Sequence, residues 1–159
     1  MWDVYLEIEI NDKQEYKNMK LDNALFDTVL EQAKESPRKR MHFDMRTQAM
    51  ENVVDANAEP WVDMSQRILN VLLPETKPAI HKHSETTETV VICRGSVIIE
   101  FYGADGIKTE EFLLKAGGDC VGVQIPRGVY HTMVCLEPGS VVFEAKDRPY
   151  DPEKTEEFL

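Results

Sequence analysis

The stretch HKHSETTETVVICRG, residues 81–95, decides how the whole chain is interpreted. His81 and His83 are separated by one residue, and successive side chains of a strand point to opposite faces, so both imidazoles share one face if the stretch is extended. Four residues separate His83 from Glu88, which is enough for a turn, so Glu88 is expected on the neighbouring strand. Gly95 follows after six more residues, where the next turn is expected. The stretch therefore predicts adjacent strands that bring two histidines and a carboxylate together.

A second motif, PRGVYH at residues 126–131, supplies a third histidine. Pro126 and Gly128 are typical of a tight turn, and His131 follows as the chain enters another strand. Three neutral imidazoles and one carboxylate suit one divalent metal ion, and this ligand set does not distinguish Fe, Mn, Ni, Co and Zn. We expect the ion to keep one or two coordination positions open. The predicted metal ligands are His81, His83, Glu88 and His131.

From about residue 66 onward, short apolar runs alternate with turn signals such as Arg94-Gly95 and Glu137-Pro138-Gly139. Many short runs at near-regular spacing predict an all-β fold, a sandwich or small barrel, rather than an α/β fold. The expected strands are Gln66–Leu73, Ala79–His83, Glu88–Arg94, Ser96–Tyr102, Ile107–Leu114, Cys120–Ile125, Tyr130–Leu136 and Ser140–Ala145.

The N-terminal part of the chain has different patterns. A strand is predicted where apolar residues recur at every second position, at Trp2, Val4, Leu6, Ile8 and Ile10. A helix is predicted from Asp22 to about Glu35, with Asp22 as N-cap and Pro37 beyond its end, because apolar residues recur at intervals of three and four. That stripe consists of Leu25, Phe26, Val29, Leu30 and Ala33, and we interpret it as a packing surface that could include a dimer contact. Residues 36–64 are expected to form loops with at most a short strand or turn.

A length of 159 residues predicts a single domain. Within it we expect an N-terminal strand, helix and loop extension at residues 1–62, a barrel at 63–148 and a C-terminal tail over the surface at 149–159. The chain has 18 Lys and Arg against 29 Asp and Glu, a formal net charge of −11, which disfavours nucleic acid and anionic membranes as partners. It shows no secretory signal and no apolar run of membrane-spanning length, so a cytoplasmic location is expected. The three cysteines are expected to be reduced thiols.

Residues 81–131 resemble the two-part signature of the cupin superfamily, in which three histidines and one glutamate converge on a metal inside a barrel. The resemblance implies a small cupin-type β-barrel, the double-stranded β-helix or jelly roll, with an added N-terminal strand and one helix. The sequence departs from the cupin pattern at Cys120, where glycine is common, and at Cys135, where asparagine is common. Neither departure removes a ligand, although both change the expected surroundings of the site.

A longer resemblance covers roughly residues 20 to 152 and is similar to the WbuC family of cupin-fold metalloproteins. It is carried by Ser36–His42, Gln66–Asn70, Leu73-Pro74 before His81, Phe143–Lys146 and Pro149–Pro152. The resemblance implies a connection with surface-polysaccharide biosynthesis in bacteria and supplies no reaction.

Strand parity predicts the walls of the cavity around the metal. If His131 points inward, so do Met133 and Cys135, and Glu88 implies Val90 and Ile92 on its face, which gives a largely apolar cavity. Substrate recognition is then expected partly at the rim, since guanidinium groups bind carboxylate or phosphate with two hydrogen bonds. The candidate substrate-binding residues are Arg38, Arg40, His42 and Asn70. The alternative is a solvated basic segment after a helix and an asparagine that serves the backbone.

These observations predict a metal-dependent enzyme that acts on a small polar metabolite, such as a sugar or sugar-nucleotide derivative. An isomerase or epimerase, a lyase and an oxygenase are all compatible with an open metal site. The alternative is a non-catalytic metal-dependent ligand-binding or regulatory module, because no obvious general base stands apart from the ligands. A small-molecule ligand and a homodimer are the expected partners.

Overall fold

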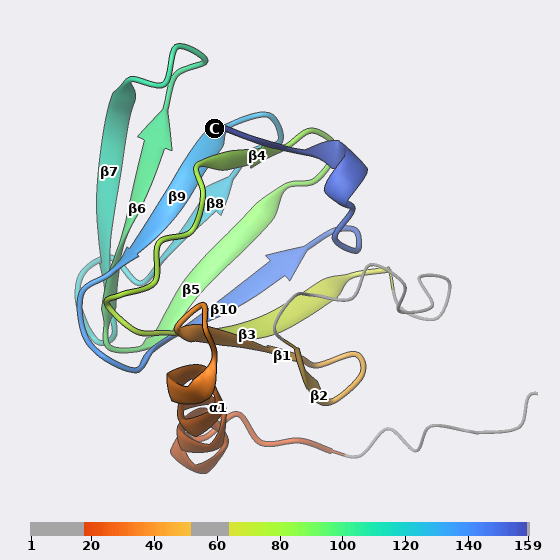
Figure 1. The fold of residues 1–159 in the computed structure, drawn as a ribbon, viewed down its shortest axis with the longest axis vertical. Coiled ribbons are helices and arrows are strands. Elements are labelled where there is room, and N and C mark those ends of the chain that lie inside the picture. The colour runs from red at the N-terminus through yellow and green to blue at the C-terminus, as the bar shows by residue number, and fades with distance from the viewer. Residues whose placement is uncertain (1–17, 52–63, 159) are drawn as a thin grey trace, which may run out of the picture.

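The computed structural model describes residues 18–51 and 64–158, and the strand expected at residues 2–10 lies outside this range. One helix is followed by eleven strands and a short 3-10 helix in the described residues (Figure 1). The elements are α1 Asn23–Glu35, β1 Arg40–Asp44, β2 Ala49–Glu51, β3 Gln66–Leu72, β4 His81–His83, β5 Glu88–Arg94, β6 Ser96–Tyr102, β7 Lys108–Lys115, β8 Gly122–Ile125, β9 Tyr130–Cys135, β10 Ser140–Lys146, η1 Pro152–Lys154 and β11 Thr155–Glu157.

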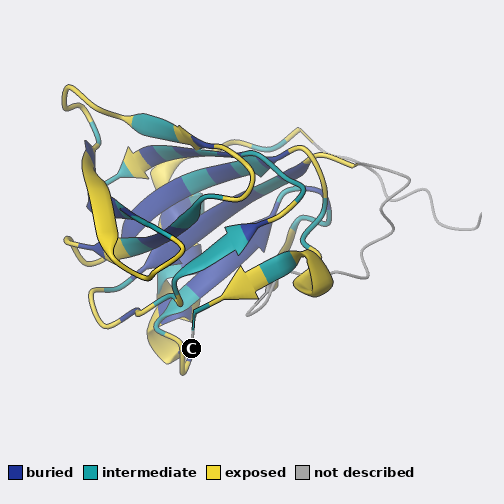
Figure 2. Ribbon diagram, turned by 90° about the horizontal axis from the view of Figure 1, so that it is seen from above, coloured by how far each residue is buried: buried dark blue, intermediate teal, exposed yellow. Residues whose placement is uncertain are grey.

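The strands form two antiparallel sheets that pack against each other. One sheet has six strands in the order β2-β1-β3-β10-β5-β8, and the other has five in the order β11-β4-β9-β6-β7. Buried residues concentrate on the inner strands, whereas most of the connecting turns are exposed (Figure 2). An inner apolar cluster fills the space between the sheets with side chains that include Val90, Ile92, Val97, Ile99 and Cys135.

Helix α1 covers the outer face of the six-stranded sheet beside β1 and β3 (Figure 1). Asp22 caps it as expected, because its Oδ1 accepts a hydrogen bond of 3.1 Å from the backbone N–H of Leu25. The buried residues of the helix, Phe26, Val29 and Ala33, pack in a second apolar cluster against the sheet. The apolar stripe is therefore used for packing within the chain, as expected. The helix is also too short and too polar to cross a membrane, and none of the described helices could do so.

All eight strands expected after residue 65 are present, with ends that differ by at most two residues. Three further strands lie in segments where the sequence predicted loops or a tail. β1 and β2 form a hairpin that extends the six-stranded sheet, and β11 pairs with β4. The sheets thus reach beyond residues 63–148 in both directions, and the tail contributes an edge strand to the five-stranded sheet.

Candidate metal centre and cavity

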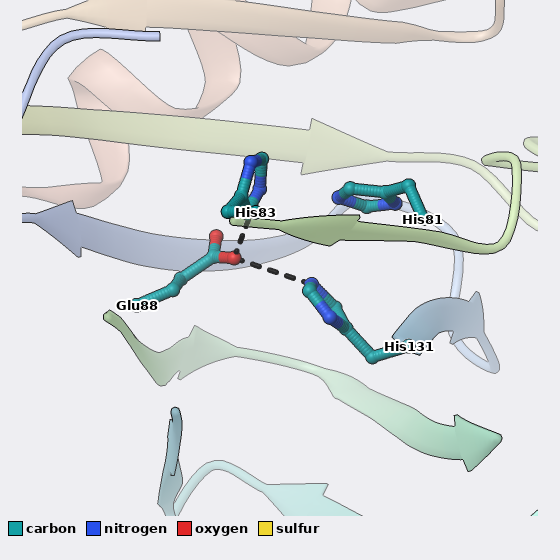
Figure 3. A group of neighbouring side chains, drawn as sticks. All are labelled: His81, His83, Glu88 and His131. Carbon is teal, nitrogen blue, oxygen red and sulfur yellow. Dashed lines mark ion pairs between the residues drawn. The ribbon is translucent and has the colours of Figure 1, made fainter. Parts of the chain in front are cut away.

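Four side chains converge between the two sheets (Figure 3). His81 and His83 lie on β4, His131 lies on the adjacent β9, where it pairs directly with His81, and Glu88 begins β5 of the opposite sheet. One potential ligand atom from each residue lies within 4.8 Å of all the others. The structure therefore brings the four predicted ligands together in a cluster that could hold a metal ion.

Backbone carbonyl groups fix the orientation of two of the imidazoles. The Nδ1 atom of His81 lies 3.0 Å from the carbonyl oxygen of Ala79, and that of His131 lies 2.9 Å from the carbonyl oxygen of Val129. A carbonyl oxygen only accepts hydrogen bonds, so Nδ1 carries a proton in both rings. With Nδ1 engaged in this way, Nε2 is the nitrogen that each ring could offer to a metal.

The third imidazole is oriented by the C-terminal segment. His83 Nδ1 lies 3.2 Å from the hydroxyl oxygen of Thr155 on β11. The same hydroxyl donates a hydrogen bond of 3.0 Å to the carbonyl oxygen of Asp151, so its own proton is already used. Thr155 must then accept from His83 Nδ1, which leaves the Nε2 lone pair free here too.

The electrostatics of the cluster favour a cation at its centre. Glu88 Oε2 lies 3.6 Å from His83 Nε2 and 3.3 Å from His131 Nε2. Burial, helped by the charge of Lys146, lowers the pKa of His83 to about 3, and burial together with His131 lowers the pKa of His81 to about 4. The neutral rings of His81 and His83 then have lone pairs available to a cation, and His83 Nε2 and Glu88 Oε2 are buried without a hydrogen-bond partner. A bound metal ion would satisfy all of these atoms, so the donor set fits.

The carboxylate of Glu88 is held by a buried cation on the neighbouring strand. Lys146 Nζ lies 3.5 Å from Glu88 Oε1, and both side chains are buried. Burial by itself would raise the pKa of Glu88, but the charge of Lys146 and the contact with His131 outweigh it and keep that pKa well below its usual value. Oε1 therefore faces the lysine while Oε2 remains available to a metal.

The cluster lies in the wall of a cavity of about 540 Å³, a size typical of small-molecule sites. The predicted substrate-binding residues Arg38, Arg40, His42 and Asn70 all line this same cavity. His42 and Asn70 are direct cross-strand partners on β1 and β3, and Arg40 precedes His42 on the same face of β1. Residues from segments far apart in the sequence are thus gathered beside the candidate metal centre.

The cavity is more polar than strand parity predicted. Val90 and Met133 line it as expected. Ile92 and Cys135 do not line it and are buried in the inner apolar cluster instead. Glu144 and Lys146 on β10 line it as well, and neither was singled out as a site residue.

Glu144 is a buried carboxyl group that is not part of the candidate ligand set. Its Oε1 accepts a hydrogen bond of 2.8 Å from Asn70 Nδ2. Burial, followed by the nearby negative charge of Glu88, raises the pKa of Glu144 to about 6. The sequence did place Val142 and Glu144 on one face of the predicted strand, and Lys146 follows in the same alternation. Charged residues at every second position of a strand usually mark a solvated face, so they did not indicate a cavity.

The fold and the cluster define a cupin-fold protein with a candidate centre for one metal ion. The chain belongs to the family described as "Domain of unknown function (DUF6016)", whose model matches residues 21–114. No curated protein matches the sequence.

Solved structures share the fold at low sequence identity. CapF from Staphylococcus aureus, described as a capsular polysaccharide assembling protein, gives a TM-score of 0.52 at 21% identity, over 60% of this chain and 27% of CapF. The E162A mutant of oxalate decarboxylase OxdC from Bacillus subtilis gives a TM-score of 0.52 at 16% identity, over 75% of this chain and 28% of OxdC. Another CapF structure contains the inhibitor 3-isopropenyl-tropolone. The chain thus spans less than a third of the length of either protein.

Proposed function

We propose that this chain is a metal-dependent enzyme acting on a small polar metabolite, such as a sugar or sugar-nucleotide derivative. One observation carries the proposal. Three imidazoles with their Nε2 atoms available as ligands and one carboxylate oxygen converge in the wall of a 540 Å³ cavity that also contains unpaired polar groups. A purely structural metal site is closed by protein ligands, whereas this site borders space that a small molecule can enter.

Each described side chain has a distinct task in this proposal. His81, His83 and His131 would hold the ion through Nε2, and Glu88 would hold it through Oε2. The bound ion would polarise an oxygen atom of the substrate. Lys146 would keep the Glu88 carboxylate in place, and Glu144, a carboxyl group in the wall of the same cavity, would transfer a proton to or from the substrate. These roles are compatible with an isomerase or epimerase, a lyase or an oxygenase.

The biological setting is proposed from two likenesses. The residues at 36–42, 66–70 and 143–152 are similar to the WbuC family, which implies surface-polysaccharide biosynthesis, and the fold is shared with CapF, a capsular polysaccharide assembling protein. Membership of the WbuC family and a homodimer stay predictions. We place the protein in the cytoplasm, where its three free cysteines would remain reduced.

Elemental analysis of protein purified without chelators tests the first step. We expect close to stoichiometric metal in the wild type and its loss in His81→Gln and Glu88→Gln. His42→Gln is the matched control, because His42 is a buried histidine of the same cavity outside the cluster. A wild type without metal that also fails to bind added Fe(II), Mn(II) or Zn(II) would contradict the proposal.

Turnover is tested with the metal-loaded protein. Tropolone offers two adjacent oxygen donors to a metal, so we expect it to bind competitively with the substrate. Turnover of a sugar or sugar nucleotide that depends on His81 supports an enzyme. Ligands that compete with tropolone and are never converted would instead assign the chain to the non-catalytic, ligand-binding alternative.

A further inference from the structure

The cavity contains a hydrogen-bonding subsite apart from the metal cluster. His42 and Asn70 are only 6% and 4% exposed, and both line the cavity. Within the described part of the chain, His42 Nδ1 and Asn70 Oδ1 have no hydrogen-bond partner. Buried polar atoms without partners are costly, so two such atoms on adjacent strands indicate groups that a ligand is meant to satisfy.

A cation without a bound partner lies next to these groups. The Arg40 guanidinium lines the cavity, and among the residues described by the structure it forms no ion pair or hydrogen bond. Lys146, by contrast, is committed to Glu88. Burial lowers the pKa of Arg40 more than the carboxylate of Glu144 raises it, so the protein itself compensates this charge incompletely. Arg40 is therefore the group of the cavity best placed to receive an anion.

The charge balance of the cavity also favours an anion. The lining residues carry four cationic side chains and four carboxylates, so the wall is formally neutral when the histidines are neutral. A divalent ion would leave it with an excess of two positive charges. This excess attracts an anion, and the Arg40 guanidinium can hold the carboxylate of a ligand through two hydrogen bonds.

The neighbouring atoms specify the rest of the ligand. Asn70 Oδ1 can only accept a hydrogen bond, and its amide nitrogen already donates to Glu144. A ligand must therefore present a donor to Asn70, as a hydroxyl group does. His42 is held neutral, since burial lowers its pKa to about 3, and a neutral ring can exchange hydrogen bonds with a further hydroxyl.

We propose that the cavity binds a hydroxylated carboxylic acid of the sugar-acid class, with its carboxylate on Arg40 and its hydroxyl groups on Asn70 and His42. This inference rests on the proposed function, because the metal centre would occupy the other end of the same ligand site. The inference narrows the proposed substrate class from small polar metabolites to acidic ones.

Calorimetric titration of the metal-loaded protein with matched ligands tests this inference. The pairs are galacturonate with galactose, glucuronate with glucose, and gluconate with sorbitol, and cyclohexanecarboxylate serves as an acid without hydroxyl groups. We expect at least one sugar acid to bind about ten-fold or more tightly than its neutral partner and than cyclohexanecarboxylate, the effect of one charge-assisted hydrogen-bonded contact.

Variants assign the preference to residues. Arg40→Gln should remove the advantage of the acid over its neutral partner, Arg40→Lys should keep part of it, and Asn70→Leu should reduce the advantage over cyclohexanecarboxylate. Arg127→Gln is the matched control, since Arg127 is exposed and does not line the cavity. Melting temperature and metal content are measured for every variant. If Arg40→Gln does not fold, the affinity of Arg40→Lys for the acid and for its neutral partner shows whether the preference depends on Arg40.

Two outcomes overturn the inference and differ from a failure of the proposed function. If metal is stoichiometric and no acid binds better than its neutral partner, or if the preference survives in Arg40→Gln, the cavity does not select sugar acids through Arg40. If the wild type binds no metal at all, the proposed metal-dependent function is itself contradicted.

Discussion

At the scale of single residues, Glu88 has two carboxylate oxygens with different surroundings. Oε1 faces Lys146 at 3.5 Å, and Oε2 faces the Nε2 atoms of His83 and His131. A lysine on the next strand thus decides which oxygen a metal can use. Residues that orient ligands in this way typically affect metal affinity nearly as strongly as the ligands do.

Replacing Lys146 should therefore weaken metal binding without removing a ligand. We expect Lys146→Met to lower metal affinity by about 10- to 100-fold, measured by competition with a chromophoric chelator. The free energy of unfolding of the metal-free protein should also fall by about 3–5 kcal/mol, because Glu88 and Glu144 lose a buried cation. Lys115→Met, at an exposed position, should change neither quantity, and unchanged metal affinity in Lys146→Met would refute the orienting role.

His42 predicts a pH dependence of stability that does not involve the metal. Burial, followed by the charge of Arg40, lowers its pKa from 6.5 to about 3 in the folded protein. Between these two values the unfolded chain binds the proton and the folded chain does not, so acidification favours unfolding. At pH 5 this amounts to about 2 kcal/mol. Urea unfolding in chelator at pH 7.5 and pH 5 should thus show a loss about 2 kcal/mol smaller in His42→Gln than in the wild type.

The candidate ligands were predictable from the sequence, and their polar neighbours were not. His81, His83 and Glu88 lie within one short stretch, where strand parity and a turn are enough to place them together. Glu144 and Lys146 occupy a strand whose other face is covered by α1, so a pattern that normally marks one solvated face here belongs to a strand buried on both. The packing of α1 on this strand is a long-range contact, and the local spacing of apolar residues does not predict it.

At the scale of elements, β11 connects the C-terminal segment to the metal centre. Its three residues pair with the three residues of β4, and Thr155 lies directly opposite His83. The Thr155 hydroxyl thereby sets which nitrogen of His83 is free. The segment is thus part of the site.

Thr155 variants test this connection. Thr155→Val keeps the size and the β-branched shape of the side chain and removes the acceptor, so metal affinity should fall by about ten-fold. Thr155→Ser keeps the hydroxyl and should bind metal like the wild type. Thr109→Val on the exposed strand β7 is the control for the same substitution elsewhere. Equal affinities in Thr155→Val and Thr155→Ser would show that His83 is oriented by other contacts.

The elements that the sequence did not predict are defined by their partners. β1 is buried at four of its five positions, so it lacks the alternation that reveals a strand with one solvated face. β11 has the sequence TEE, which has little apolar character. This strand is extended because it pairs with β4. The strands after residue 65 were predictable because turn residues separate them.

At the scale of the whole molecule, the ligands come from both sheets. Glu88 belongs to the six-stranded sheet, and the three histidines belong to the five-stranded sheet. A metal ion would therefore join the two layers.

Metal binding should stabilise the entire fold. At a free metal concentration 100 times the dissociation constant, the free energy of unfolding should rise by about 2.7 kcal/mol. Denaturant unfolding with metal and with excess chelator measures the difference. Of the four residues in the described cluster, only Glu88 belongs to the six-stranded sheet. The free energy of unfolding of Glu88→Gln should therefore rise far less when metal is added. An equal response in the wild type and Glu88→Gln would place the metal elsewhere.

The division of ligands between two sheets also has a kinetic consequence. An ion held by one strand could leave through a local fluctuation, but here its full release requires the carboxylate on one layer to separate from the imidazoles on the other. The layers are packed around a continuous apolar interior, so such separation is a rare breathing motion. The rate at which the ion exchanges with solution should then follow the hydrogen-exchange rate of the backbone amides around β4 and β5. Substrates that fill the cavity should slow both rates together.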